Sequence, residues 1–393
     1  SIIILIYHMS SKIKVLQVIP ELGYGGAETG CYDLAHYLAE ENCSSYIITS
    51  GGKLIKFINK KKVRVIRLPV HSKNPILILF NSLVISLIVL FFNIDIVHAR
   101  SRAPAWSCFI SCFFTRRKFV TTFHGTYNFS NVVKKYYNSI MLRSKLIIAG
   151  SNFVFKHINE NYKKYLKTKN KLLVIFRGIN LEYFNNKNIS EQKKLETMQK
   201  WNIQENKFII LLPGRLTRWK GQENFIEAIN LLIENYQKND FHAIILGSDQ
   251  GRNVYTKRLQ NLVSRYNLTK KIQFIQHCSE MPIAYSIASI VVSSSIEPEA
   301  FGRVAVEAQA MKKLIIASDI GGSKETIING KSGFLYKADD PRELAKFINN
   351  SMEFDGEALY LMGNEGRKNV SKKFDVENMC QTTLREYRKL LNN

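Results

Sequence analysis

The chain has 393 residues, of which 46% are hydrophobic and 22% are charged. At about 150 residues per domain this length predicts two or three domains, and the apolar content excludes a disordered or fibrous chain. Lysine and arginine outnumber the acids by 56 to 32, a net charge of +24, so an anionic partner such as nucleic acid, lipid or a phosphorylated substrate is expected. Compositional drift could produce the same charge, so charge alone selects no partner.

The six cysteines predict neither structural zinc nor disulfides. None of them has CxxC spacing, and a chain this long buries its own core, which favours a reducing cytosol. Residues 1–9 are apolar but lack the basic start and cleavage site of a secretory signal. We interpret them as an upstream extension ahead of the fold.

Short apolar runs alternate with amphipathic stretches from residue 14 onward. A helix is expected at 27–42, with further helical stretches between most of the strands. The strands expected in the first half are 14–20, 45–49, 63–68, 95–98, 119–122, 146–149 and 173–176. Strands that alternate with helices predict βαβ units and a parallel sheet.

Residues 75–92 are almost entirely apolar and approach the lower length limit of a transmembrane helix. A true span would place the two halves of one sheet on opposite sides of a bilayer, because this segment lies inside a βαβ unit. We therefore expect a buried core helix. The alternative is a helix lying on a membrane, supported by the basic run at 60–64.

The alternation restarts after a polar stretch at 185–207, which suits an interdomain connection with one short helix. The strands expected here are 208–213, 243–246, 272–276, 290–293 and 314–317, and a last helix is expected at 376–391. The predicted fold is α/β, with two tandem Rossmann-like, doubly wound domains at 1–185 and 186–375 that face a cleft. The helix within 376–393 could pack back on the first domain. Such sheets bind ligands at the carboxyl ends of their strands.

The most informative motif is SSSIEPEAFGRVAVEAQAM at 293–311. It follows a β-branched strand and runs into a helix that is expected to begin near 301–303, where outward-pointing amides can bind phosphate. Those amides belong to Gly302, Arg303 and Val304. Glu307 suits the vicinal hydroxyls of a ribose, and Glu299 can reach the group beyond a diphosphate. An acidic pair that merely supports the helix dipole is the alternative.

The second motif, PGRLTRWKG at 213–221, follows the first strand of the second half. Arg215 and Lys220 can converge there to neutralise a diphosphate, and hydrogen bonds to a charged group are typically worth about 1.5–3 kcal/mol each. A basic surface turn that keeps the loop soluble is the alternative interpretation.

Weaker motifs end strands of the first half. The glycine turn that contains Gly25 and Gly26 lacks both dinucleotide and P-loop spacing, yet it offers backbone donors to an anion. His98 and His124 follow apolar strands, where a histidine could bind a sugar hydroxyl or exchange a proton. Lone histidines in such positions are more often structural.

Together these motifs resemble the retaining glycosyltransferases of the GT-B family 4, over nearly the whole chain after residue 12. The resemblance is carried by GGAE, HARSRAP, TFHG, RGIN, GRLTRWKG and EPEAFGRVAVEAQA. The sequences of these motifs are similar to those of bacterial members that build lipopolysaccharide or other surface glycans. It implies a nucleotide-sugar donor, commonly UDP-linked, and a glycan or lipid-linked acceptor.

The resemblance also implies a role for each candidate residue. Arg215 and Lys220 would hold the diphosphate without a metal, since no DxD motif is present, and no other cofactor is expected. Glu307 would bind the ribose, Glu299 would contact the donor sugar, and His124 would position the reacting sugar. The phosphates would be held by the amides of Gly302, Arg303 and Val304 and, from the first half, by Gly25 and Gly26. Surface-glycan acceptors are usually lipid-linked, so we expect a cytoplasmic enzyme bound peripherally to an anionic inner membrane face.

Two alternatives remain from the sequence. A sugar-nucleotide epimerase uses a similar scaffold, but the E-x7-E spacing and the GRLTRWKG loop favour transfer. A nucleic-acid-binding protein is suggested by the charge alone. No recognised nucleic-acid motif is present and the basic residues are spread over both halves, so no nucleic-acid partner is expected.

Overall fold

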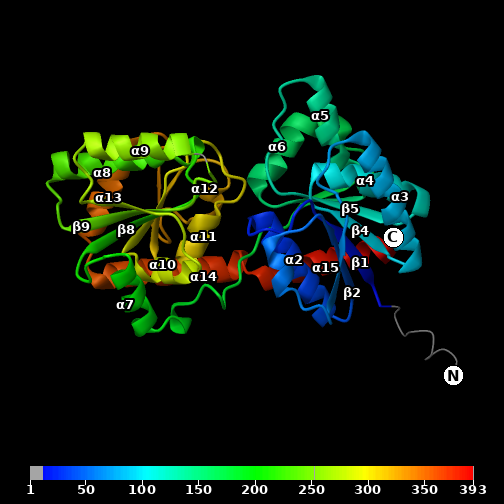
Figure 1. Ribbon diagram of the computed structural model, residues 1–393, viewed down its shortest axis with the longest axis horizontal. Helices are drawn as coiled ribbons and strands as arrows, with labels where there is room; N and C mark the ends of the chain where they lie inside the picture. Colours follow the sequence, from blue (N-terminus) through cyan, green and yellow to red (C-terminus); the bar gives the residue numbers. More distant parts are fainter. Residues whose placement is uncertain (1–11, 252, 393) are drawn as a thin grey trace. The chain divides into compact units, whose positions relative to one another are not determined.

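The computed structural model describes residues 12–251 and 253–392, and the interpretation of residues 1–9 lies outside them. The chain forms two compact units (Figure 1). One unit ends at Gly178 and takes in the chain again from Val376, and the other is Ile179–Asp375. The first unit thus ends at Gly178 rather than at residue 185, and the last helix belongs to it.

The first unit contains a seven-stranded sheet in the order β3-β2-β1-β4-β5-β6-β7, and all its strand pairs are parallel. The strands are β1 (Lys14–Val18), β2 (Ser44–Thr49), β3 (Val63–Arg67), β4 (Ile96–Ala99), β5 (Lys118–Phe123), β6 (Leu146–Ala149) and β7 (Lys171–Val174). The order reverses between β1 and β4. Ligands of doubly wound sheets bind at such a switch point, outside the carboxyl ends of the strands.

Helices flank this sheet. They are α2 (Gly26–Glu40), α3 (Pro75–Phe91), α4 (Arg102–Thr115), α5 (Val132–Asn138), α6 (Asn152–Tyr162) and α15 (Val376–Asn392). Figure 1 shows α15 beside α2. Leu384 and Tyr387 of α15 join Leu34 and Leu38 of α2 in one buried cluster. The last helix therefore completes the core of the first unit, although most of the chain separates it from that unit in sequence.

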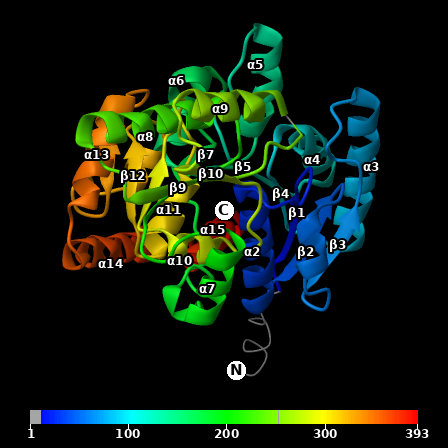
Figure 2. The same cartoon turned by 60° about the vertical axis from the view of Figure 1, so that its left-hand side comes forward.

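Helix α3 has its polar side inward, and the expectation of a buried core helix is wrong in this respect. Asn81 and Ser82 are buried, whereas seven apolar side chains of the helix are exposed. These are Ile76, Leu79, Phe80, Leu83, Leu87, Leu90 and Phe91. Figure 2 shows α3 on the outside of the first unit. Among the described residues, no helix is long and apolar enough to cross a membrane.

The second unit contains a six-stranded parallel sheet in the order β10-β9-β8-β11-β12-β13. Its strands are β8 (Phe208–Pro213), β9 (Phe241–Leu246), β10 (Ile272–Ile275), β11 (Ile290–Ser293), β12 (Leu314–Ser318) and β13 (Phe334–Tyr336). Strand β13, only three residues long, is absent from the sequence expectation. The order reverses between β8 and β11, so these two strands mark the switch point of this unit.

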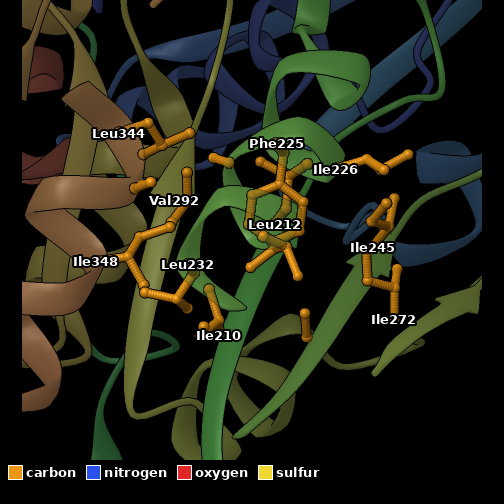
Figure 3. Close-up of a cluster of buried hydrophobic side chains, with 14 of the residues drawn as sticks. Ile210, Leu212, Phe225, Ile226, Leu232, Ile245, Ile272, Val292, Leu344 and Ile348 are labelled. Atoms are coloured by element: carbon orange, nitrogen blue, oxygen red, sulfur yellow. The ribbon is translucent and has the colours of Figure 1, made fainter. Parts of the chain in front are cut away.

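The helices of the second unit pack on its sheet and form its core. They are α7 (Glu191–Lys200), α8 (Gln222–Tyr236), α9 (Asn253–Arg265), α10 (Met281–Ile287), α11 (Arg303–Ala310), α12 (Ser323–Thr326), α13 (Pro341–Met352) and α14 (Gly356–Lys373). Figure 3 shows Phe225 of α8 at Leu212 of β8, and Leu344 and Ile348 of α13 beside Val292 of β11. This apolar core packs against β8 and β11, the two strands that the candidate motifs follow.

Candidate functional site

The loops after β8 and β11 are locked together at the switch point of the second unit. Gly221, at the end of the β8 loop, has φ +70°, and a Cβ atom there would lie 1.8 Å from the carbonyl oxygen of Ser294. The hydroxyl of Ser294 donates to the carbonyl oxygens of Lys220 (3.1 Å) and Gly221 (2.9 Å). Only glycine satisfies both the backbone conformation and the close approach. The two motifs found in the sequence therefore form one site.

Lys220 and Glu299 are joined in this site. The ammonium nitrogen of Lys220 lies 2.8 Å from Oε1 of Glu299, and the two side chains are only 14% and 10% exposed. The hydroxyl of Ser295 donates to the same oxygen at 2.5 Å. The sequence analysis assigned Lys220 to the diphosphate and Glu299 to the donor sugar. Here each compensates the charge of the other.

Glu307 is buried on α11 with both carboxylate oxygens engaged. Oε1 accepts from Nε of Arg303 at 2.5 Å, and Oε2 accepts from the hydroxyl of Tyr285 at 2.7 Å. Burial and then the charge of Glu307 raise the pKa of Tyr285 well above its ordinary value, so Tyr285 remains a neutral donor. Each carboxylate oxygen can accept a second hydrogen bond, which leaves capacity for a pair of hydroxyls. Tyr285 was missed in the sequence because it lies on a short helix without a motif.

Helix α11 begins where the sequence analysis placed it. Gly302 precedes it with φ +82°, and a Cβ atom there would lie 2.7 Å from Cα of Ser323. The amides of Arg303 and Val304 occupy the first turn, where helix geometry supplies no acceptor. This end of the helix can therefore hold an anion.

Arg215 is exposed in the β8 loop, and it has no carboxylate partner among the described residues. Its backbone is fixed, since Nε2 of Gln222 donates to its carbonyl oxygen at 2.8 Å. Arg215, Lys220 and Glu299 thus lie in the loops that follow β8 and β11, and Arg303 and Glu307 lie on α11, which follows the second of these loops.

The remaining candidates, Gly25, Gly26 and His124, lie at the carboxyl ends of strands in the first unit. Gly25 caps α2, and Gly26 opens it. His98 is enclosed, with Nδ1 2.5 Å from the hydroxyl of Tyr387 and Nε2 2.7 Å from that of Thr122. Both ring nitrogens of His98 are occupied, so its role is structural.

His124 differs from His98 in this respect. Its Nε2 lies 3.4 Å from NH1 of Arg100, while its Nδ1 is buried without a partner among the described residues. Burial, the nearby Arg177 and then Arg100 lower the pKa of His124 well below its ordinary value. Arg100 and Arg177 lie in two of the sequence motifs, HARSRAP and RGIN, but no role was predicted for either arginine. An arginine directly after a buried strand is the signal that could have identified Arg100.

No group of three or more histidine, cysteine, aspartate or glutamate side chains in residues 12–251 and 253–392 is arranged to hold a metal ion. The cysteines are free.

Two tandem Rossmann-like sheets with candidate residues at their switch points are the architecture of the GT-B glycosyltransferases. Residues 24–183 match the family described as Glycosyltransferase Family 4, and residues 193–369 match the one described as Glycosyl transferases group 1. A solved glycosyltransferase from Rickettsia africae is 40% identical with a TM-score of 0.89, over 98% of this chain and 100% of that one. The chain belongs to the family 4 glycosyltransferases.

A further solved structure shares the fold, and a further curated protein is similar in sequence. HepE of Anabaena is 22% identical with a TM-score of 0.81, over 96% of this chain and 100% of its own. The capsular polysaccharide biosynthesis glycosyltransferase CapM of Staphylococcus aureus is 24% identical over 371 residues, which are 89% of this chain and 93% of CapM. Membership of this family favours glycosyl transfer over the epimerase and nucleic-acid alternatives.

Proposed function

We propose that this chain is a retaining glycosyltransferase that moves a sugar from a UDP-linked donor to a glycan or lipid-linked acceptor of a surface polysaccharide or lipopolysaccharide. The observation that carries the proposal is the interlocked β8 and β11 loops, which gather cations, buried acids and a helix start at one switch point. HepE has been solved with UDP and glucose, and CapM is named for capsular polysaccharide biosynthesis. Both support this choice of donor and product.

The proposed chemistry uses this chain's own side chains. Arg215, Lys220 and the α11 amides would stabilise the charge that builds on the leaving diphosphate, with no metal required. Glu307, already fixed by Arg303 and Tyr285, would accept from the ribose hydroxyls. Retention would follow from same-face attack, with the leaving phosphate assisting deprotonation of the acceptor. His124 would position the sugar.

Thermal unfolding with UDP, GDP, ADP and their sugars, with and without EDTA, tests the donor. A ligand at about 100 times its dissociation constant adds about 2.7 kcal/mol, which raises the midpoint by several degrees. We expect stabilisation by the uridine series alone, unchanged by EDTA. Stabilisation by another base, or none at all, would contradict the UDP assignment, and a loss of the effect with EDTA would contradict metal independence.

An epimerase would convert its nucleotide sugar without an acceptor. Incubation of the protein with UDP-sugars alone, followed by chromatography of the sugar nucleotides, separates the two reactions. We expect no epimer.

We further propose that the enzyme acts at an anionic cytoplasmic membrane face, which it contacts through α3 and the end of α4. Two hydrogen bonds join the inner side of α3 to α4: the hydroxyl of Ser86 donates to that of Ser111 at 3.1 Å, and Ser107 of α4 donates to the carbonyl oxygen of Ile78 at 3.1 Å. The outer face is left with the seven exposed apolar side chains.

Aromatic and basic residues lie at the carboxyl ends of these two helices. Phe113 and Phe114 are 72% and 73% exposed. Arg116 follows the end of α4 at Thr115, and Arg117 donates to the side chain of Asn93, which lies just beyond α3, at 2.7 Å. An apolar face with aromatic and cationic edges is suited to the interface of an anionic bilayer.

Vesicle flotation of the double variant Leu83→Gln/Leu87→Gln tests this face. Both leucines are more than 60% exposed, so the fold should be unaffected. The variant should lose its binding to vesicles of phosphatidylcholine and phosphatidylglycerol, as the wild type should at high salt. Val254→Gln, at a still more exposed apolar site in the second unit, is the control. Binding that persists in the double variant would refute the assignment.

A further inference from the structure

We propose that the first unit holds a site for an anionic group of the acceptor, a phosphate or a carboxylate, built by Arg100, Arg177 and the ring of His124. The assignment of this anion to the acceptor rests on the proposed function. The evidence for the anion site itself comes from the structure of the first unit alone.

The three side chains line one recess at the switch point of the first sheet, and each follows a different strand: β4, β7 and β5. The first residue of α2, Gly26, lines it too, so the positive end of a 15-residue helix contributes. The recess is small, with about 30 Å³ open to water-sized groups, which is room for the oxygen atoms of a charged group. Among the described residues, no aspartate or glutamate lines it.

Arg100 is held by a neutral side chain. Its Nε donates to Oε1 of Gln17 at 2.7 Å, and Nε2 of Gln17 in turn donates to the carbonyl oxygen of Cys31 at 3.1 Å. Gln17 is fully buried, and Arg100 is 5% exposed with no carboxylate partner among the described residues. A buried guanidinium without a counter-charge is costly. An amide at this position fixes the arginine without cancelling its charge, which leaves that charge for a ligand.

The contact with Arg100 determines the tautomer of His124. A guanidinium has no acceptor, so Nε2 of His124 must accept the hydrogen bond at 3.4 Å. In the neutral ring the proton then resides on Nδ1. That N–H is buried and has no acceptor in the described part of the chain. A ligand oxygen would supply one.

Arg177 lies over the same turn. A Cβ atom at Gly26 would be 3.1 Å from NH1 of Arg177, and one at Gly150 would be 3.4 Å from its Cγ. The two glycines therefore leave room for this side chain beside the start of α2. Two guanidinium groups and a neutral N–H donor match a phosphate or carboxylate, which accepts several charge-assisted hydrogen bonds.

Titration of the full chain, labelled with ¹³C at histidine Cε1, tests the site without knowledge of the acceptor. The probes are inorganic phosphate, glucuronate and neutral glucose, and His124→Gln assigns the resonance. We expect a saturable shift of the His124 signal with phosphate or glucuronate and none with glucose. The better of the two anions names the charged group. No shift with either anion would overturn the site.

The matched variants are Arg177→Gln in the recess and Arg67→Gln at an exposed position on β3. Arg177→Gln should weaken anion binding about tenfold or more, because it removes charge-assisted bonds, while Arg67→Gln should leave it unchanged. The enclosed His98 signal verifies the fold of each variant. Equal weakening of anion binding in both variants would show that the effect comes from the change in net charge, and it would overturn the proposal.

Repeating the titration with saturating UDP separates acceptor from donor. An unchanged phosphate response supports an acceptor site, whereas competition by UDP would assign the recess to the donor phosphates and overturn it. Failure of UDP to bind at all would contradict the proposed donor, with the phosphate titration still deciding on the anion site.

Discussion

Replacement of Lys220 by alanine should affect both stability and donor binding, and a double-mutant cycle with Glu299 separates the two effects. Lys220→Ala leaves the Glu299 carboxylate 10% exposed with Ser295 as its remaining side-chain donor. Loss of a hydrogen bond to a charged group costs about 1.5–3 kcal/mol. The ion pair therefore predicts that the free energy of unfolding falls by about 2–3 kcal/mol.

The cycle compares Lys220→Ala, Glu299→Ala and the double variant by urea unfolding. Tryptophan fluorescence reports mainly on the second unit, because Trp201 and Trp219 lie there and only Trp106 lies in the first. The double variant should cost less than the sum of the single ones by about 1.5–3 kcal/mol. Additivity within about 0.5 kcal/mol would refute the coupling.

The same samples measure donor binding. If Lys220 contacts the diphosphate, a tenfold loss of affinity leaves about half of the stabilisation of about 2.7 kcal/mol that UDP gives the wild type at 100 times its dissociation constant. Full stabilisation of Lys220→Ala by UDP would restrict Lys220 to a structural role.

Three further outcomes are expected. Gly221→Ala should destabilise the second unit by more than about 3 kcal/mol in urea unfolding, because its Cβ atom would lie 1.8 Å from the Ser294 carbonyl oxygen at φ +70°. Arg215→Ala should change stability by less than about 0.5 kcal/mol yet weaken UDP binding about tenfold in calorimetry. Burial lowers the pKa values of His98 and His124 in the folded state, so stability should fall as the pH drops below about 6.5. Two such groups give about 2.7 kcal/mol per pH unit, and a flat profile in urea unfolding between neutral and acidic pH would contradict neutral buried rings.

The fold was predictable because buried parallel strands are continuous β-branched runs. Residues 146–149, 208–213 and 290–293 form strands with the expected bounds. Strand β13 was not predictable, since three residues at a sheet edge carry no period. Helix α3 has the expected bounds to within one residue, but an apolar helix has no amphipathic pattern to tell its inner from its outer face. The inner face of α3 is set by its packing against α4, where the hydroxyl of Ser86 donates to that of Ser111.

The candidate site was likewise predictable from the sequence only in part. The two motifs that contain Gly221 and Gly302 were identified from the sequence, and both glycines have positive φ and a close backbone approach in the structure. Pairing between distant side chains has no local signature, which is why the Lys220–Glu299 pair and the Tyr285 hydroxyl on Glu307 were missed. For the same reason the role of Gln17 was not predicted. It is a lone amide in an apolar strand, and its Oε1 accepts a hydrogen bond from Arg100.

The buried cation of the second unit, Lys220, is paired with a carboxylate, whereas Arg100 of the first unit is held by a neutral amide. The variant Glu299→Gln measures what this pairing does to donor binding. In the second unit Lys220 is neutralised by Glu299 before any ligand arrives, so a diphosphate has to compete with a carboxylate for that ammonium. Removal of the carboxylate charge frees Lys220 for phosphate, and UDP should then bind more tightly, by up to about tenfold. Turnover should nevertheless fall, since Glu299 is the residue assigned to the donor sugar. Calorimetry with UDP, set against the transfer rate, distinguishes the two effects. Weaker UDP binding in Glu299→Gln would mean that the carboxylate orients Lys220 toward the phosphates rather than competing with them.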